Sequence, residues 1–149
     1  MNLGSISFFV EETEFPLFFN KSRIRAWIRR LAQSHGKTVD FVNFIFCSDP
    51  YILQINRQYL DHDYFTDIIT FPYKEDEEIA ADIYISLDTV RENARDYGAH
   101  FQNELLRVMA HGILHLSGFG DKVEDQVRLM RQAEDEAVSN YFQHMDEEE

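Results

Sequence analysis

The sequence has a single cysteine, only three prolines and six glycines, and no long apolar run. Because Cys47 has no second thiol to pair with, an intramolecular disulfide is excluded and a reducing, cytoplasmic location is expected. No apolar segment approaches the roughly 20 residues that span a bilayer, and no basic segment followed by an apolar one opens the chain, so neither a membrane partner nor secretion is expected. Nothing resembles a linker, and we expect residues 1–149 to form one domain.

Basic residues are the minority, because 14 lysines and arginines face 27 acidic residues and give a net charge of −13. An acidic field of this kind repels a polyanion and argues against non-specific binding of nucleic acid. The charge is unevenly distributed, however. The segment 21–37 has no acidic residue and carries six basic ones: Lys21, Arg23, Arg25, Arg29, Arg30 and Lys37. This segment is either a solvated helix face or a surface that meets a phosphate backbone.

The hydrophobic pattern predicts an α+β fold in which a mixed sheet of about four strands packs with helices. We expect strands at 5–10, 39–47, 66–71 and 81–87, and helices at about 21–35, 49–59, 88–97, 101–117 and 123–142. Asn20, Asp49 and Asp88 are the expected N-caps of the first three helices. The acidic end, 144–149, has the wrong sign of charge for a helix C-terminus and is expected to fray.

The most informative segment runs from His111 to Asp121, on the fourth predicted helix and the turn after it. On a helix, His111 and His115 project from one face with Cβ atoms about 5–6 Å apart, a separation at which two imidazoles can bind one metal ion. Gly118 can adopt the left-handed conformation that ends the helix, which lets Asp121 return as a third ligand. Three protein ligands leave a position for water, as in catalytic zinc sites. We therefore predict one divalent metal ion, Zn²⁺ first, with Ni²⁺ or another transition metal as alternatives.

A histidine pair at this spacing can also be a coincidence or a satisfied pair in the core. The glycine and the third donor favour the metal site over these alternatives. Glu104 lies seven residues before His111 and nearly on the same helix face. It is either a carboxylate that orients a ligand or an ordinary exposed glutamate. The other histidines are expected to be surface or core residues: His35, His62, His100 and His144.

The spacing resembles that of the metzincin proteases, whose motif is H-E-x-x-H-x-x-G-x-x-H. In that motif the glutamate after the first histidine is the general base, and this position is Gly112 here. A peptidase without a carboxylate beside its water lacks the base that peptide hydrolysis needs. A zincin-like metallopeptidase is therefore the weaker alternative.

A second resemblance covers most of the chain. The segment His111–Gly118 resembles the H-G-x-L-H-L-x-G signature of the YbeY family of metal-dependent endoribonucleases. Asn56–Tyr59 with Asp63–Pro72, and Ala81–Ile85, are similar to that family's N-x-x-Y-R-x-x-D-x-P-T-D-V-L-S-F-P and G-D-I-x-I blocks. The resemblance implies an α+β sandwich with the metal at the end of a cleft, and hydrolysis of single-stranded RNA. It also implies a role in ribosomal RNA processing and ribosome biogenesis, with ribosomal RNA precursor and the ribosome or its proteins as partners.

The chain departs from the family pattern at two positions. Asp121 stands where the family usually has a third histidine, and its negative charge makes the bound metal a weaker Lewis acid. Leu60 replaces an arginine that is thought to contact the phosphate, and an alkyl chain cannot do so. Two interpretations stay open. Either Arg57, Arg107 or Lys122 supplies the cation, or the protein is a non-catalytic ribosome-associated factor with a structural metal.

Overall fold

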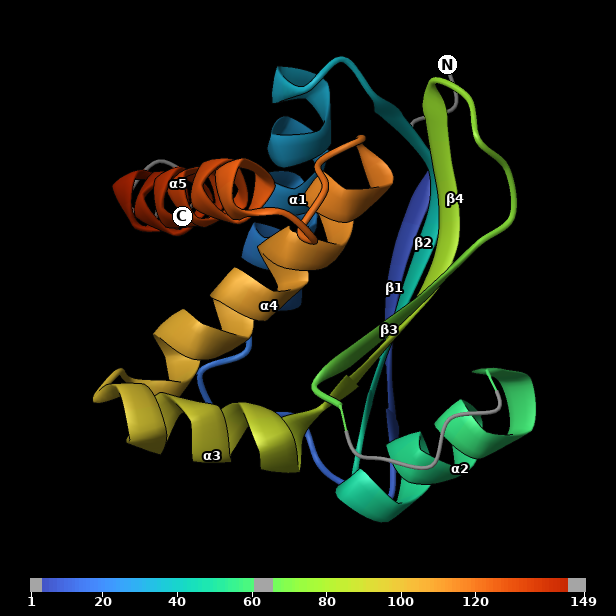
Figure 1. Cartoon of the computed structure of the whole chain (residues 1–149), viewed down its shortest axis with the longest axis vertical. Helices are drawn as coiled ribbons and strands as arrows, with labels where there is room; N and C mark the ends of the chain where they lie inside the picture. The colour runs from blue at the N-terminus through green and yellow to red at the C-terminus, as the bar shows by residue number, and fades with distance from the viewer. Residues whose placement is uncertain (1–3, 61–65, 145–149) are drawn as a thin grey trace.

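The computed structural model describes residues 4–60 and 66–144, which form one four-stranded sheet with helices packed on it (Figure 1). Three strands pair in parallel: β1 (Ser5–Glu11), β2 (Thr38–Cys47) and β4 (Glu78–Ser86). The fourth strand, β3 (Ile68–Pro72), pairs antiparallel to β4, and the order across the sheet is β1-β2-β4-β3. The predicted α+β class and the mixed sheet are therefore confirmed.

Five helices accompany the described strands: α1 (Lys21–Ser34), α2 (Asp49–Leu60), α3 (Leu87–Tyr97), α4 (Phe101–Leu116) and α5 (Glu124–Gln143). Each predicted helix is present, with ends that differ by a residue or two. Within residues 4–60 and 66–144, no helix is both long enough and apolar enough to cross a membrane. Fraying was predicted for the acidic end 144–149, of which residues 145–149 lie outside the described residues. The single domain over 1–149 stays a prediction.

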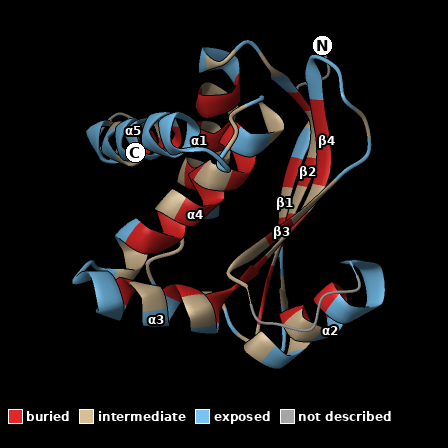
Figure 2. Cartoon of the chain, in the orientation of Figure 1, coloured by how far each residue is buried: buried red, intermediate tan, exposed pale blue. Residues whose placement is uncertain are grey.

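The two faces of the sheet bury cores of different size (Figure 2). Alternate side chains of a strand point to opposite faces, so Phe44 and Ile83 enter the larger core beneath α1 and α4. On the other face Cys47 and Ile69 pack with Ile52 of α2 in a smaller cluster. Figure 1 shows α2 across the sheet from α4. Side chains of α2 and α4 are therefore separated by the sheet itself.

Side-chain caps begin the first three helices, but two of the three predicted caps are wrong. Asn20 caps α1 as predicted, while Ser48 caps α2 and Ser86 caps α3. Asp49 lies inside the first turn of α2, where its carboxylate accepts hydrogen bonds from Ser86 Oγ at 2.5 Å and Thr89 Oγ1 at 2.6 Å. Ser48, next to Asp49, already caps the N-terminus of α2, so the carboxylate of Asp49 is not needed as a cap. Asp49 instead connects α2 to α3.

Glycine allows α4 to lie close to the sheet just after the first predicted metal ligand. A Cβ atom at Gly112 would lie 3.1 Å from Ile68 Cδ1 and 3.4 Å from Ile83 Cδ1, so any larger residue would have to displace these isoleucines. The helix ends at Leu116, and Gly118 has a φ of +107°. The turn that was predicted after the helix is thus present.

Candidate metal centre

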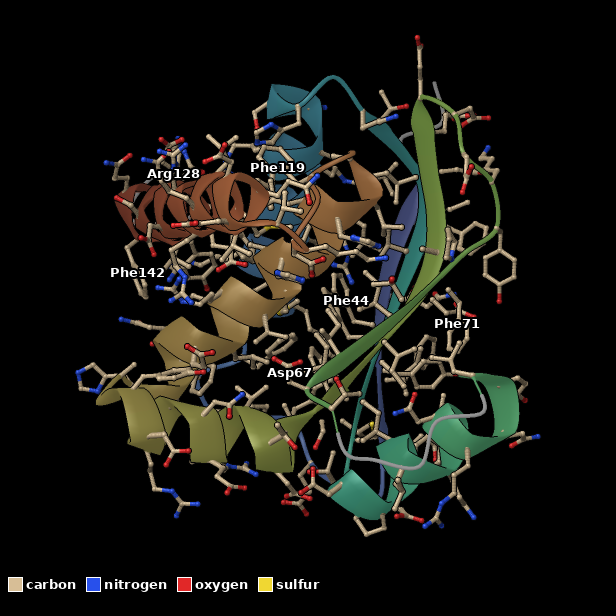
Figure 3. All side chains as sticks on the ribbon, viewed as in Figure 1. Phe44, Asp67, Phe71, Phe119, Arg128 and Phe142 are labelled. Atoms are coloured by element: carbon tan, nitrogen blue, oxygen red, sulfur yellow. The ribbon has the colours of Figure 1, made fainter. Side chains whose placement is uncertain are left out.

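A pocket of about 480 Å³ opens between the start of β3, the helices α3, α4 and α5, and the turn after α4. Its polar and charged lining residues come from all of these elements: Thr66, Asp67, Thr70, Asn93, Tyr97, Glu104, Arg107, His111, His115, Asp121, Arg131 and Glu134. The three predicted ligands are all among them. Figure 3 places Asp67 between the start of β3 and the helices α3 and α4.

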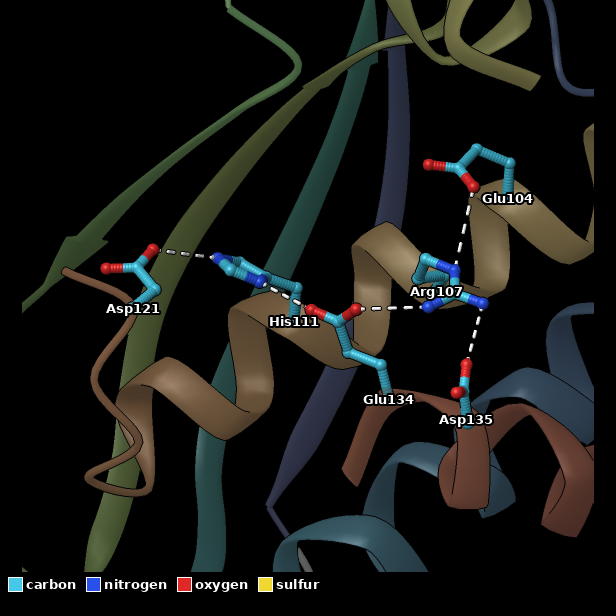
Figure 4. A network of polar contacts seen from close by, with 6 residues as sticks. All are labelled: Glu104, Arg107, His111, Asp121, Glu134 and Asp135. Atoms are coloured by element: carbon cyan, nitrogen blue, oxygen red, sulfur yellow. Dashed lines mark hydrogen bonds and ion pairs between the residues drawn. The ribbon is translucent and has the colours of Figure 1, made fainter. Parts of the chain in front are cut away.

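His111 and Asp121 face one another in this pocket. The Nε2 atom of His111 lies 3.4 Å from Asp121 Oδ2 (Figure 4). His115 lies one helical turn further along α4 and lines the same pocket. Among residues 4–60 and 66–144, no three histidine, cysteine or acidic side chains are grouped closely enough to hold a metal as they stand. The backbone therefore brings the three residues to one pocket, while their joint ligation stays a prediction.

The other nitrogen of His111 contacts Glu134, a residue that the sequence did not point to. His111 Nδ1 lies 2.7 Å from Glu134 Oε2, and Glu134 is only 6% exposed. When Nδ1 donates its proton to Glu134, Nε2 keeps its lone pair on the side of Asp121, which is the form of imidazole that binds metal ions. The donor set and the orientation of this ring therefore fit a divalent transition metal.

The sequence did contain a signal for Glu134. On α5 it lies between the buried residues Met130 and Ala137, at the spacing of one helix face. A glutamate within a buried helix face needs a partner, because a buried carboxylate without one is costly. The sequence could not tell which partner this would be.

Glu104 was predicted either to orient a metal ligand or to be exposed. It is buried, and its ion pair is with Arg107 rather than with a predicted ligand. It is 6% exposed, and its Oε1 lies 3.6 Å from Arg107 Nε. Arg107 also lies 3.3 Å from Glu134 Oε1 through Nη1 and 2.7 Å from Asp135 Oδ1 through Nη2 (Figure 4). Arg107 thus balances three carboxylates, and its charge is not available to a phosphate.

Burial and these contacts shift the protonation of several pocket residues. Burial raises the pKa of Asp67 and of Glu104, and nearby cationic groups offset this only in part. The hydrogen bond with Glu134 raises the pKa of His111, against the opposing effect of burial. The carboxyls of Asp67 and Glu104 therefore hold protons more readily than fully exposed carboxyls do.

The position that aligns with the family arginine does not reach this pocket. Leu60 is the last residue of α2, is 38% exposed and does not line the pocket, and the same helix carries Arg57. Lys122 does not line it either. Of the three cations proposed from the sequence, Arg107 alone lies in the pocket, and it is already paired.

The basic segment 21–37 also lies outside the pocket, and part of it supports the fold. Arg25 Nε donates to the backbone oxygen of Ile6 at 2.9 Å, and Arg29 Nη2 donates to that of Gly4 at 3.3 Å. These arginines tie α1 to the edge strand β1. Contact of this segment with RNA stays a prediction. Among the remaining histidines, His35, His100 and His144 do not line the pocket. His62 lies outside the described residues.

Comparison with known proteins agrees with this architecture. A family model described as "Endoribonuclease YbeY" matches residues 8–142. A protein named "Endoribonuclease YbeY" from Parabacteroides distasonis is 43% identical over 135 residues, which cover 91% of this chain and 94% of the relative. Another of that name, from Bacteroides thetaiotaomicron, is 48% identical over 119 residues, which cover 80% and 87%. A protein from Thermotoga maritima solved in solution is 28% identical, with a TM-score of 0.67 over 95% of this chain and 92% of the other.

Proposed function

Because the chain belongs to the YbeY endoribonuclease family, we propose that it cleaves single-stranded RNA with the help of a divalent metal ion held by His111, His115 and Asp121. Membership makes the protein a hydrolytic nuclease whose substrate is RNA. The proposal is finer in three respects. The substrate is ribosomal RNA precursor, the process is ribosome biogenesis in the cytoplasm, and the ribosome or its proteins are further partners.

The observation that carries the metal site is the position of the His111 ring. Glu134 contacts its Nδ1 atom at 2.7 Å, and its Nε2 atom faces Asp121 in a pocket that His115 also lines. A carboxylate behind a histidine is the usual support of a metal ligand, since it fixes the ring and makes the other nitrogen more basic. We propose Zn²⁺ as the ion, with Ni²⁺ or another transition metal as alternatives. An ion bound there supplies Lewis acidity and positive charge beside the phosphate.

The protein's own residues then have separate tasks. Glu134 holds the proton on His111 Nδ1, and Arg107 Nη1, 3.3 Å from Glu134 Oε1, holds the glutamate side chain in place. Asp121 contributes a negative charge to the site, which lowers the Lewis acidity that three neutral histidines would leave.

Asp67 is the pocket carboxyl that we propose to accept the proton of the attacking water. Within the described part of the chain it forms no ion pair, whereas Glu104 and Glu134 pair with Arg107. Burial raises the pKa of Asp67, which suits a general base that works near neutral pH. Asp67→Asn is expected to slow RNA cleavage about 10²-fold or more while the bound metal is retained. An unchanged rate would assign the proton to another group.

The metal site is tested by elemental analysis of three alanine variants, one for each proposed ligand. Each is expected to lose most of its metal while staying folded, whereas His100→Ala, at the start of the same helix, should keep it. If Asp121→Ala retained the metal at full stoichiometry, Asp121 would not be a ligand. Cleavage of single-stranded RNA should stop when a chelator is added and return with the metal. Cleavage that persists in chelator would refute metal dependence.

A further inference from the structure

Two arginines line the pocket within the described part of the chain, and they differ in their surroundings. Arg107 is bound to three carboxylates, as described above. Arg131, on α5, forms no hydrogen bond or ion pair with any residue of segments 4–60 and 66–144. Arg131 is also exposed, so its guanidinium is open to a ligand that enters the pocket.

The absence of a hydrogen bond or salt bridge at Arg131 follows from the contacts that the neighbouring acidic residues already make. On a helix, a side chain meets those three and four residues away, which for Arg131 are Glu134 and Asp135 on its C-terminal side. Arg107 contacts both of these carboxylates, and His111 contacts Glu134 as well. On the N-terminal side the corresponding residues are Val127 and Arg128, which cannot neutralise a cation. Among the described residues Arg131 thus has no hydrogen bond or salt bridge, although its charge acts on the nearby Glu104 and lowers the pKa of that carboxyl. Acidic residues outnumber basic ones 27 to 14 in this chain.

The acidic lining of the pocket explains why a cation at Arg131 would matter for an RNA ligand. Asp67, Glu104, Asp121 and Glu134 all line the pocket, and Arg107 is already engaged with two of them. An anionic phosphodiester that enters such a pocket is repelled unless positive charge lies beside it. A guanidinium suits this role, because its planar fork can donate two parallel hydrogen bonds to one phosphate.

We infer that Arg131 binds a backbone phosphate of the RNA strand that occupies this pocket. The inference rests on the proposed function and names a residue that holds the substrate there. Three residues of helix separate Arg131 from Glu134, a rise of about 4.5 Å, and Glu134 contacts His111. Arg131 therefore holds the strand within one helical turn of the carboxylate that supports the metal site, where it positions the phosphodiester for hydrolysis.

The test compares Arg131→Gln and Arg131→Lys with Arg128→Gln. Arg128 is on the same helix but pairs with Asp125 and does not line the pocket, which makes it a matched control. The probe is a fluorescent single-stranded RNA with phosphorothioate linkages, which slow hydrolysis but keep the negative charge of each phosphate, and its affinity for the metal-loaded protein is measured by anisotropy over a salt series. Melting temperatures verify that each variant is folded.

Arg131→Gln is expected to raise the dissociation constant about tenfold, and to reduce the slope of log affinity against log salt by about 0.7, the value for one phosphate of a single strand. Arg131→Lys should restore the slope but only part of the affinity, since it keeps the charge without the fork. Arg128→Gln should match the parent. Equal affinity and slope in the parent and Arg131→Gln would overturn the inference.

The outcomes for Arg131 and for the proposed function can be told apart. If the parent binds the probe through Arg131 but does not cleave unmodified RNA, the proposed hydrolysis is wrong and the phosphate contact stands. If the parent cleaves RNA and Arg131→Gln binds and cleaves equally well, the hydrolysis stands and the phosphate contact is wrong. If the parent binds no RNA, both are wrong.

Discussion

The contact between Glu134 and His111 makes a prediction about metal affinity that can be given a magnitude. Glu134→Gln keeps the size and shape of the side chain and an oxygen that can accept from His111 Nδ1, but it removes the negative charge. The bond is short, at 2.7 Å, and Glu134 is 6% exposed, so water screens the lost charge poorly. Removing a carboxylate behind a ligating histidine typically weakens metal binding 10–100-fold, or about 1.4–2.8 kcal/mol. We expect a loss in this range.

A second effect opposes this loss and must be separated from it. The hydrogen bond with Glu134 raises the pKa of His111, so a proton competes with the metal for the ring. Without the carboxylate the pKa of His111 falls and this competition weakens, which favours the metal at acidic pH. At alkaline pH the ring is neutral in both proteins and only the loss remains. The predicted weakening should therefore be largest at alkaline pH and shrink as the pH falls.

The assay is competition for Zn²⁺ with a chromogenic chelator over a pH series. Glu104→Gln is the control, because Glu104 is also 6% exposed and contacts the same Arg107 but does not touch His111. Metal affinity should be unchanged in this control. Equal affinity of Glu134→Gln and the parent at alkaline pH would refute the supporting role of Glu134. Equal weakening in both variants would show that the charge of the network matters rather than the contact with His111.

Three further predictions concern residues outside this network. Gly112→Glu should destabilise the fold by more than about 3 kcal/mol in denaturant unfolding, because its side chain would meet Ile68 and Ile83 in the core and bury a charge; near-parent stability would contradict this packing. Burial raises the pKa of the Cys47 thiol from 9.0 to about 12, so below pH 9 alkylation of the native protein should be about 10³-fold slower than that of the unfolded chain. For the same reason the contribution of the protonated thiol to the free energy of unfolding is present below pH 9 and is lost as the pH rises towards 12. Alkylation of the native protein as fast as that of the unfolded chain would contradict the raised pKa. Leu60→Arg should change neither RNA cleavage nor melting temperature, because Leu60 is partly exposed and does not line the pocket; a gain in rate would place this position at the substrate.

The features that the sequence predicted well depend on local spacing. The interval between His111 and His115, the positive φ at Gly118 and the cap at Asn20 each involve residues a few positions apart. Helix geometry and glycine conformation relate such residues without knowledge of the tertiary structure. The predicted caps at Asp49 and Asp88 were wrong, because local sequence offers two suitable residues at each helix N-terminus. In both cases a serine one or two residues earlier is the cap.

The supporting residues of the site could not be predicted in this way. Glu134 and Asp135 reach Arg107 and His111 only because α5 packs against α4, more than 20 residues later in the chain. Glu104 satisfied the sequence criterion for a supporting carboxylate, since it lies on the face of His111, but a helix face does not reveal what packs against it. A pairwise spacing rule therefore identifies candidate ligands and leaves the groups that orient them undetermined.

Asp121 and Arg131 both affect the net charge of the pocket, and this charge determines how strongly the pocket attracts a phosphate. An aspartate in place of a neutral histidine makes the net charge of a metal site one unit less positive, and the side chain of Leu60 carries no charge. The attraction between a guanidinium and a phosphate depends on their separation and the surrounding dielectric, not on which helix carries the arginine. An arginine on α5, one turn from Glu134 and without a salt bridge among the described residues, can therefore replace a cation that the resemblance would place after Asn56–Tyr59, on α2. If Arg131 binds the strand, the departures at Asp121 and Leu60 are compatible with a working nuclease, and neither favours a purely structural metal.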